Sequence, residues 1–438
     1  MPDNANHSVP RRVHDVMAIP NTNDLRECHD CGLFQRLGAL RPGQVAECER
    51  CGAILRRRRR NSLTTTAALS FAGLMLLFVA LISPMLDFRL AGQQQSTGLA
   101  GLPVGFENQD MPILAIVVFV TTMAAPFLRL FLTLLVIAGL RGGIARHWLI
   151  MMARLRGLLR PWAMIEVFML GMFVAYTRLA ALATVEIGLG LYALGALMVV
   201  TAWADCWLDD DALWSAIQRK GVAAAVPMTG PLIGCDVCDQ VTRGVPGDLC
   251  PRCDTPLQHR KPNAIGRTWA LLIASALLYI PANLLPVMTV IRLGKGAPST
   301  IIGGVIELIE YRMWPLAALV FVASILVPML KLVGMGALLI MMQAGAGGRL
   351  QDRTRIFRLV DFIGRWSMID VFMVGILTAV VRMGSLASVT PEWGAVAFAS
   401  VVVCTMLAAL SFDPRMMWDA AERRAVDGAP ARPVGVAA

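Results

Sequence analysis

The sequence predicts an all-α integral membrane protein with eight transmembrane helices, arranged as two tandem four-helix modules. Of its 438 residues, 56% are hydrophobic and 16% are charged, a composition that ordinary soluble domains do not have. The hydrophobic residues lie in blocks of about 20, the length at which a helix crosses a hydrocarbon core about 30 Å thick. The chain also repeats itself, with four apolar blocks in each repeat.

The apolar blocks define the expected spans and the segments between them. The spans fall at about 63–86, 111–138, 162–182, 187–208, 267–290, 313–342, 366–387 and 393–411. The first block is too long for the apolar core of a signal peptide, so we expect the polar segment before it to be retained. The expected divisions are a disordered terminus (1–27), a first cysteine domain (28–55), module 1 (63–208), a linker (209–234), a second cysteine domain (235–257), module 2 (266–412) and a tail (413–438).

Basic residues set the expected orientation. The loop between the second and third spans carries five arginines, and so does the loop between the sixth and seventh spans. By the positive-inside rule these loops are cytoplasmic, which places both termini and the linker in the cytoplasm. Topology therefore accounts for the net charge of +10, and we expect no nucleic-acid partner.

The two modules form a tandem repeat. A shift of 202 residues aligns Pro126 with Pro328 and Arg129 with Lys331. A shift of 204 aligns the segment 162–171 with 366–375, which share the pattern Trp-x-Met-Ile-acid-Val-Phe-Met-x-Gly. Four spans are an even number, so both modules have the same orientation, related by an axis along the membrane normal.

A pair of CxxC motifs precedes each module. Two such motifs place four thiolates around one point, the tetrahedral arrangement in which Zn²⁺ is held by four sulfurs. We therefore predict two zinc-ribbon-like cytoplasmic domains, and iron also suits such a site. The expected ligands are Cys28, Cys31, Cys48 and Cys51 in the first domain and Cys235, Cys238, Cys250 and Cys253 in the second.

The predicted metal sites favour a structural role over metal sensing or redox catalysis. Four cysteines close the coordination sphere and leave no open position for a substrate. Each domain is also too short to bury a core of its own without a metal.

Ionisable and kink-forming residues inside the spans are the candidates for a lipid pathway, because buried charges in a bilayer usually face a bundle interior or cavity. We expect inter-helix charge pairs between Arg129 and Glu166 and between Lys331 and Asp370, which either serve transport or only fix helix packing. The remaining candidates are Arg178 and Arg382 near the outer ends of their spans, and Asn283 and Pro286 in a proline-rich kink.

Motifs for several catalytic classes are absent from the sequence. It has no Gly-x-x-x-x-Gly-Lys-Ser/Thr loop, no His-Glu-x-x-His and no Gly-x-Ser-x-Gly. With five histidines in all, we expect no enzyme.

The combination of doubled CxxC pairs, the segment from Pro281 to Pro286, the Trp-x-Met-Ile-acid segments and the Arg-rich loops resembles the paraquat-inducible protein A family of intermembrane lipid transport proteins. The resemblance covers about residues 28–420. It implies a subunit in the bacterial inner membrane that partners a periplasmic tunnel protein with MCE (mammalian cell entry) domains. The implied role is to load membrane phospholipid into the tunnel or to accept it, with the outer loops at 87–110 and 291–311 as docking surfaces.

Two other functions stay open at the level of sequence. The chain could be a membrane redox or stress-sensing protein whose cysteine clusters react, or a scaffold that anchors the tunnel without moving lipid.

The sequence departs from the family pattern in module 1, where Ile82-Ser-Pro84 stands in the place of the fuller proline-rich motif of module 2.

Overall fold

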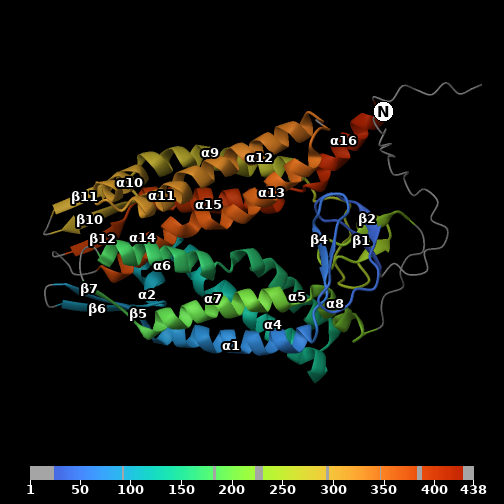
Figure 1. The fold of residues 1–438 in the computed structure, drawn as a ribbon, viewed down its shortest axis with the longest axis horizontal. Coiled ribbons are helices and arrows are strands. Elements are labelled where there is room, and N and C mark those ends of the chain that lie inside the picture. The colour runs from blue at the N-terminus through green and yellow to red at the C-terminus, as the bar shows by residue number, and fades with distance from the viewer. Residues whose placement is uncertain are drawn as a thin grey trace, which may run out of the picture.

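The computed structural model describes residues 24–90, 93–180, 184–221, 230–292, 295–345, 347–381 and 387–427. Within these ranges, eight helices are long and apolar enough to cross a membrane, as the sequence predicts. They form two bundles that lie side by side along the long axis of the molecule (Figure 1). The small cysteine domains lie at one end, which we call the ribbon end, and two short β-sheets lie at the other, the sheet end.

The two modules have the same order of elements. Module 1 consists of α1 (Ser62–Ile82), α3 (Pro112–Phe119) continuing through η2 (Val120–Ala124) into α4 (Ala125–Gly142), α5 (Arg146–Leu159) continuing through η3 (Arg160–Trp162) into α6 (Ile165–Ala180), and α7 (Leu189–Trp207). Module 2 consists of α9 (Ala264–Leu284), α11 (Trp314–Phe321) with η4 (Val322–Leu326) and α12 (Val327–Gln343), α13 (Leu350–Gly364) with η5 (Arg365–Met368) and α14 (Ile369–Val380), and α15 (Trp393–Ser411).

A π-helical turn interrupts the second span of each module. The turns η2 and η4 end two residues before Pro126 and Pro328. Proline has no N–H and its ring collides with the carbonyl four residues back, so the helix widens locally rather than continuing as an α-helix. The widened turn in module 2 carries Ser324, which is fully buried.

The segments at the sheet end form two three-stranded sheets with a short helix beside each. In module 1, β5 (Pro84–Leu90) lies between β6 (Gln93–Gly98) and β7 (Thr184–Ile187), and α2 (Gly101–Glu107) follows β6. In module 2, β10 (Met288–Arg292) lies between β11 (Lys295–Ser299) and β12 (Ala387–Pro391), and α10 (Ile301–Glu310) follows β11. The outer segments around 87–110 and 291–311 are therefore built largely of strands and helix.

The Arg-rich segments that the sequence predicts as loops are helices, α5 and α13. The apolar residues of these segments are spaced for one helix face, which the search for continuous apolar blocks missed. In α5 this face is Leu149, Ile150 and Ala153, all buried, and Arg156, about one turn further on, is buried with them.

Regular structure also lies in segments that the sequence predicts as a disordered terminus, a linker and a tail. Strand β1 (Leu25–Glu27) lies in the segment predicted as disordered, and the rest of that prediction, residues 1–23, falls outside the described ranges. Helices α8 (Asp210–Gln218) and α16 (Arg415–Asp427) follow the last spans of the two modules. Residues 428–438 of the predicted tail also lie outside the described ranges.

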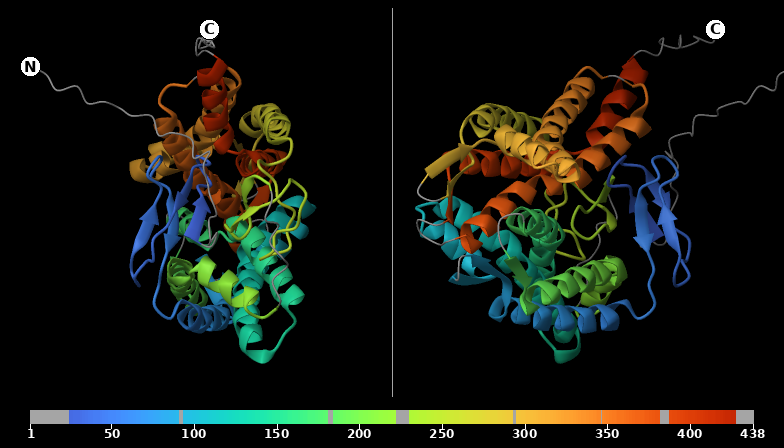
Figure 2. Two further views of the ribbon diagram at one scale, coloured as in Figure 1. Left: turned by 90° about the vertical axis from the view of Figure 1, so that its right-hand side faces the viewer. Right: turned by 60° about the vertical axis from the view of Figure 1, so that its left-hand side comes forward.

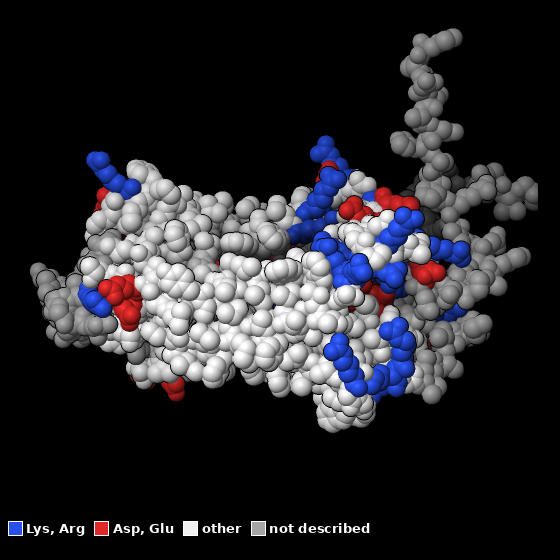
Figure 3. Space-filling view, turned by 60° about the horizontal axis from the view of Figure 1, so that its bottom comes forward, with Lys and Arg blue, Asp and Glu red and all other residues white. Residues whose placement is uncertain are grey.

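The distribution of charge fits a membrane protein. On the face shown in Figure 3, Lys and Arg gather at the ribbon end, and a broad band with almost no charged side chains lies between the two ends. Large apolar side chains of the spans are exposed, such as Phe71 and Phe78 of α1 and Leu277 of α9. A hydrocarbon environment explains this exposure, because water would oppose it.

Close backbone contacts join the first and last helices of each module. Helix α1 packs on α7, and α9 packs on α15. At the sheet end, Gly394 donates its N–H to the carbonyl of Pro286 at 3.1 Å. A Cβ atom at Gly394 would lie 2.4 Å from that oxygen, and one at the repeat-related Gly190 would lie 2.7 Å from the carbonyl oxygen of Ser83.

We predict that Gly394→Ala lowers the stability of module 2 by about 1–3 kcal/mol, because backbone atoms must move to admit the methyl group. Thermal unfolding of the purified protein in detergent measures the effect. Gly336→Ala in α12 is the matched control, since a Cβ there meets nothing within 4 Å. Equal melting temperatures for the two variants would contradict the prediction.

Candidate metal centres and polar sites

All four CxxC motifs adopt the same turn between or beside short strands. In the first domain β1 pairs with β2 (Phe34–Arg36) and β3 (Val45–Glu47) pairs with β4 (Ile54–Arg57), and in the second β8 (Leu232–Gly234) pairs with β9 (Val241–Arg243). The residue after each second cysteine has a positive φ and donates its N–H to the carbonyl of the first cysteine. These residues are Gly32, Gly52, Asp239 and Asp254.

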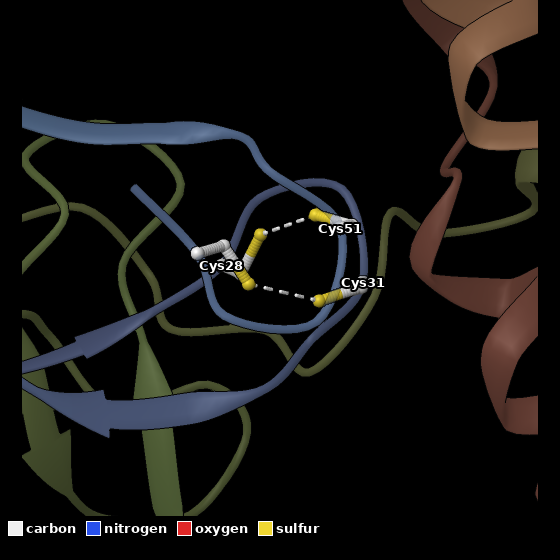
Figure 4. A group of neighbouring side chains, drawn as sticks. Cys28, Cys31 and Cys51 are labelled. Carbon is white, nitrogen blue, oxygen red and sulfur yellow. Dashed lines mark hydrogen bonds between the residues drawn. The ribbon is translucent and has the colours of Figure 1, made fainter. Parts of the chain in front are cut away.

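The turns bring four sulfurs together in each domain. In the first, which we call ribbon 1, the Sγ atoms of Cys28 and Cys51 are 3.5 Å apart and those of Cys31 and Cys48 are 3.6 Å apart (Figure 4). In the second, ribbon 2, the matching distances are 3.4 and 3.6 Å. A tetrahedral ion with Zn–S bonds of about 2.3 Å requires sulfurs about 3.8 Å apart, so both clusters fit a metal ion.

The buried thiols polarise one another in a way that suits metal binding. The hydrogen bond with Cys31 lowers the pKa of Cys28 to about 5. In ribbon 2, the hydrogen bond with Cys235 lowers the pKa of the Cys253 thiol. Each cluster therefore contains a thiol with a lowered pKa, which favours the thiolate, the form that ligates a metal.

The ribbons are crossed relative to the modules that follow them. Ribbon 1 precedes module 1 in the chain, yet its cysteines pack in one apolar cluster with Leu272, Met335, Val360 and Trp418 of module 2 and its C-terminal helix. Figure 2 shows the strands of ribbon 1 in blue, rising from α1 toward the red C-terminal helix.

Ribbon 2 makes the reciprocal contact. Its cysteines cluster with Val136, Leu149, Leu213 and Trp214 of module 1 and α8. Each ribbon therefore covers the ribbon end of the module that it does not precede.

Repeat-related arginines hold both ribbons in these positions. Arg358 in α13 donates to the carbonyl of Cys51 at 3.1 Å and to Asp30 at 2.5 Å. Arg154 in α5, its equivalent at a shift of 204, donates to the carbonyl of Cys253. The last cysteine of each ribbon is thus bonded to the amphipathic helix of the opposite module.

Ion pairs surround the crossed contacts. Asp211 accepts from Arg26 at 2.7 Å and from Arg252 at 2.9 Å, one arginine from each ribbon. Burial opposes the charged form of Asp211, but Arg252 and Arg26 outweigh it and lower the pKa of Asp211. These partly desolvated pairs are worth more than surface pairs, because water screens them less.

The corresponding cluster at module 2 centres on Arg415, which donates to Asp413 and Asp236 at 3.0 and 2.9 Å. Although burial opposes ionisation of Arg415, Asp413 and Asp236 raise its pKa. Arg415 also pairs with Glu27 of ribbon 1 at 3.4 Å, and Asp236 belongs to ribbon 2, so this cluster joins the two ribbons to each other and to α16.

We predict that disrupting one metal cluster loosens the opposite module. Cys48→Ser with Cys51→Ser should increase hydrogen–deuterium exchange in α13 and α16, because ribbon 1 packs there. Cys250→Ser with Cys253→Ser should act instead on α5 and α8. Exchange measured by mass spectrometry on both variants tests the crossing, and loosening of the module that follows the altered ribbon would contradict it.

In module 2, the predicted polar residues lie inside the bundle but do not pair with each other. Lys331 is 2% exposed, and its Nζ donates to Thr405 Oγ1 at 2.9 Å and to the carbonyl of Gly364 at 3.3 Å. Asp370 is 5% exposed, and one of its carboxylate oxygens has no hydrogen-bond partner in the described structure. Its electrostatic partner is Arg178 of module 1.

The predicted pairing is also wrong in module 1, where Arg129 pairs with Asp205 of α7 rather than with Glu166. Helix packing turns Arg129 toward the ribbon end of α7, so the guanidinium meets the carboxylate there. Glu166 is exposed, whereas its equivalent Asp370 is buried between the modules.

The other predicted residues lie toward the sheet end. Arg178 lies at the contact between modules, where its Nη2 donates to the carbonyl of Gly304 in α10 at 3.4 Å. Asn283 donates to the carbonyl of Tyr279 one turn back, and Pro286 accepts from Gly394. Arg382 falls outside the described residues.

Sequence reasoning missed Asp205, Thr405 and Ser324. Asp205 is an acidic residue two positions before the end of α7, a signal that counting charges inside the spans would have found. Thr405 and Ser324 carried no comparable signal, because hydroxyl residues are common in membrane helices and only packing brings these two beside charged groups.

Comparison with known proteins identifies one family, which matches both modules. The family model described as paraquat-inducible protein A matches residues 63–218 and 265–422. The intermembrane transport protein PqiA of Escherichia coli K12 is 35% identical over 401 residues, which cover 90% of this chain and 95% of that protein. No solved structure matches the chain.

Two further relatives align over a similar length. The lipophilic envelope-spanning tunnel protein A of Escherichia coli K12 is 30% identical over 400 residues, 91% of this chain and 92% of that protein. A probable intermembrane transport protein of Haemophilus influenzae is 28% identical over 410 residues, 91% of this chain and 96% of that protein.

Proposed function

The chain belongs to the paraquat-inducible protein A family, and from this premise we propose that it is an inner-membrane subunit of an intermembrane lipid transport system. It takes phospholipid from the membrane, or delivers phospholipid to it, and exchanges this lipid with a periplasmic MCE-type tunnel protein. The names of two relatives indicate transport as the class of function, because they describe an intermembrane transport protein and an envelope-spanning tunnel protein.

The observation that carries the proposal is the group of buried charges in module 2. Lys331 and Asp370 are almost fully buried but do not form an ion pair with each other, and Ser367 in η5, three residues before Asp370, has a hydroxyl without a partner in the described structure. Burying incompletely bonded charges costs stability, so such groups are usually retained for function. The ammonium of Lys331 would hold a lipid phosphate, while the apolar helices hold acyl chains.

The proposed topology follows from the distribution of charge. The basic ribbon end faces the cytoplasm, where reducing conditions keep the cysteine clusters available to metal. The two β-sheets face the periplasm, and their outer strands β6 and β11 offer unpaired edges to a partner.

We predict that phospholipid co-purifies with the protein and that Lys331→Met and Asp370→Asn reduce the bound amount several-fold. Both variants keep the side-chain volume nearly unchanged, so packing is preserved. Native mass spectrometry of the gently solubilised protein measures the lipid. Asp352→Asn, an exposed position in α13, is the control. Protein that carries no specific lipid would favour the scaffold function instead.

We predict about two zinc ions per chain, one in each ribbon. Elemental analysis of the same sample measures them, and Cys48→Ser with Cys51→Ser should remove one ion, whereas Cys404→Ser, outside both clusters, should remove none. Iron in the purified protein would correct the identity of the metal. Sub-stoichiometric metal with oxidised cysteines would support the redox-sensing alternative.

A photoreactive amino acid tests the docking surface. Placed at Ser96 in β6, it should crosslink to a periplasmic tunnel protein, because this exposed position lies at the sheet end. The same group at Glu49 in ribbon 1 should not. Crosslinking from Glu49 alone would reverse the proposed orientation.

A further inference from the structure

Module 1 contains a small polar cavity near its ribbon end. The cavity has a volume of about 30 Å³, enough for one or two groups the size of a water molecule. Its polar lining comes from all four spans: Thr66 and Ser70 of α1, Arg129 and Thr133 of α4, Arg156 and Glu166 of the third span, and Thr201 and Asp205 of α7.

Two hydroxyls that line the cavity have no hydrogen-bond partner among the described residues. Thr66 and Ser70 are each 1% exposed, and neither Oγ atom is bonded. Hydroxyls in membrane helices ordinarily bond to the carbonyl one turn back, as Thr133 does to Arg129 and Thr268, the module 2 equivalent of Thr66, does to Ala264. The free lone pairs of Thr66 and Ser70 therefore require a ligand that fits the cavity.

The charged side chains that line the cavity are two arginines and two acids, and one of the acids is unpaired. Its two arginines are neutralised, Arg129 by Asp205 and Arg156 by Asp210. Glu166 has no ion pair among the described residues and lies exposed at the edge of the cavity. An unpaired carboxylate beside a cavity between membrane helices favours a cationic ligand.

Module 2 shows what occupies the corresponding space there. The ammonium of Lys331 lies among the helices and bonds to Thr405, the equivalent of Thr201. In module 1 the equivalent side chain, Arg129, is turned away to Asp205, a residue that is Ala409 in module 2. Among the described residues that line it, the module 1 cavity therefore has no cationic side chain that is free to balance Glu166.

We propose that this cavity binds a small monovalent cationic group, either Na⁺ or the primary ammonium of an aminophospholipid. Glu166 supplies the counter-charge, and the oxygens of Thr66 and Ser70 accept from the ammonium or ligate the ion. Binding of a lipid ammonium rests on the proposed lipid transport, whereas binding of Na⁺ does not.

Two measurements on the full chain in nanodiscs distinguish the sources. In phosphatidylcholine, whose quaternary ammonium donates no hydrogen bond, NaCl should raise the melting temperature relative to choline chloride if Na⁺ binds. In native mass spectrometry, phosphatidylethanolamine should be retained over phosphatidylcholine by about tenfold if the lipid ammonium binds, as expected for one charge-assisted hydrogen bond. Both comparisons use the wild-type chain and do not depend on a variant folding.

Variants assign either effect to the cavity. Glu166→Gln should abolish it and Ser70→Ala should weaken it, while Glu186→Gln, an exposed acid at the sheet end, should leave it unchanged. If neither a Na⁺ effect nor a headgroup preference depends on Glu166, the proposal is overturned and the cavity holds water only. Lipid retained without headgroup preference would leave the transport function intact, and a Na⁺ effect without bound lipid would leave only the cation site.

Discussion

The contact between α6 and α14 is the interaction on which the rest of the structure depends. These repeat-related helices pack directly on each other, with the rings of Phe168 and Phe372 edge to face at 5.5 Å. A Cβ atom at Gly171 would lie 3.0 Å from Cβ of Phe372 and 3.1 Å from the carbonyl of Ile369, so glycine is what allows the approach.

The crossed ribbons reinforce that contact from the ribbon end. A short cysteine domain has too little core to fold alone, and here each one completes its core on the opposite module. The two ribbons hold the molecule together more widely than the sequence implies, because each one also ties its own module to the other. Arg154 and Arg358, at repeat-related positions, make the same contact to the last cysteine of a ribbon.

The two modules have kept their shape while their polar interiors have diverged. In module 2, Lys331 and Asp370 lie buried near the contact between modules. In module 1, Arg129 is neutralised on α7, and Glu166 is exposed beside a cavity lined by free hydroxyls. Equivalent positions thus offer different chemistry: module 2 has a buried ammonium, whereas module 1 has a polar cavity in the corresponding place.

The sequence by itself determined the eight spans, the duplication and the two cysteine clusters. These features are local or periodic: a span depends on about 20 consecutive apolar residues, and a CxxC turn on four consecutive residues. Only the tertiary structure decided that ribbon 1 packs on module 2, that Arg129 meets Asp205 rather than Glu166, and that the Arg-rich segments are helices on the ribbons. Such contacts depend on how helices rotate and pack against one another. In an apolar chain many rotations bury similar area, so the pattern of residues does not specify which charges meet.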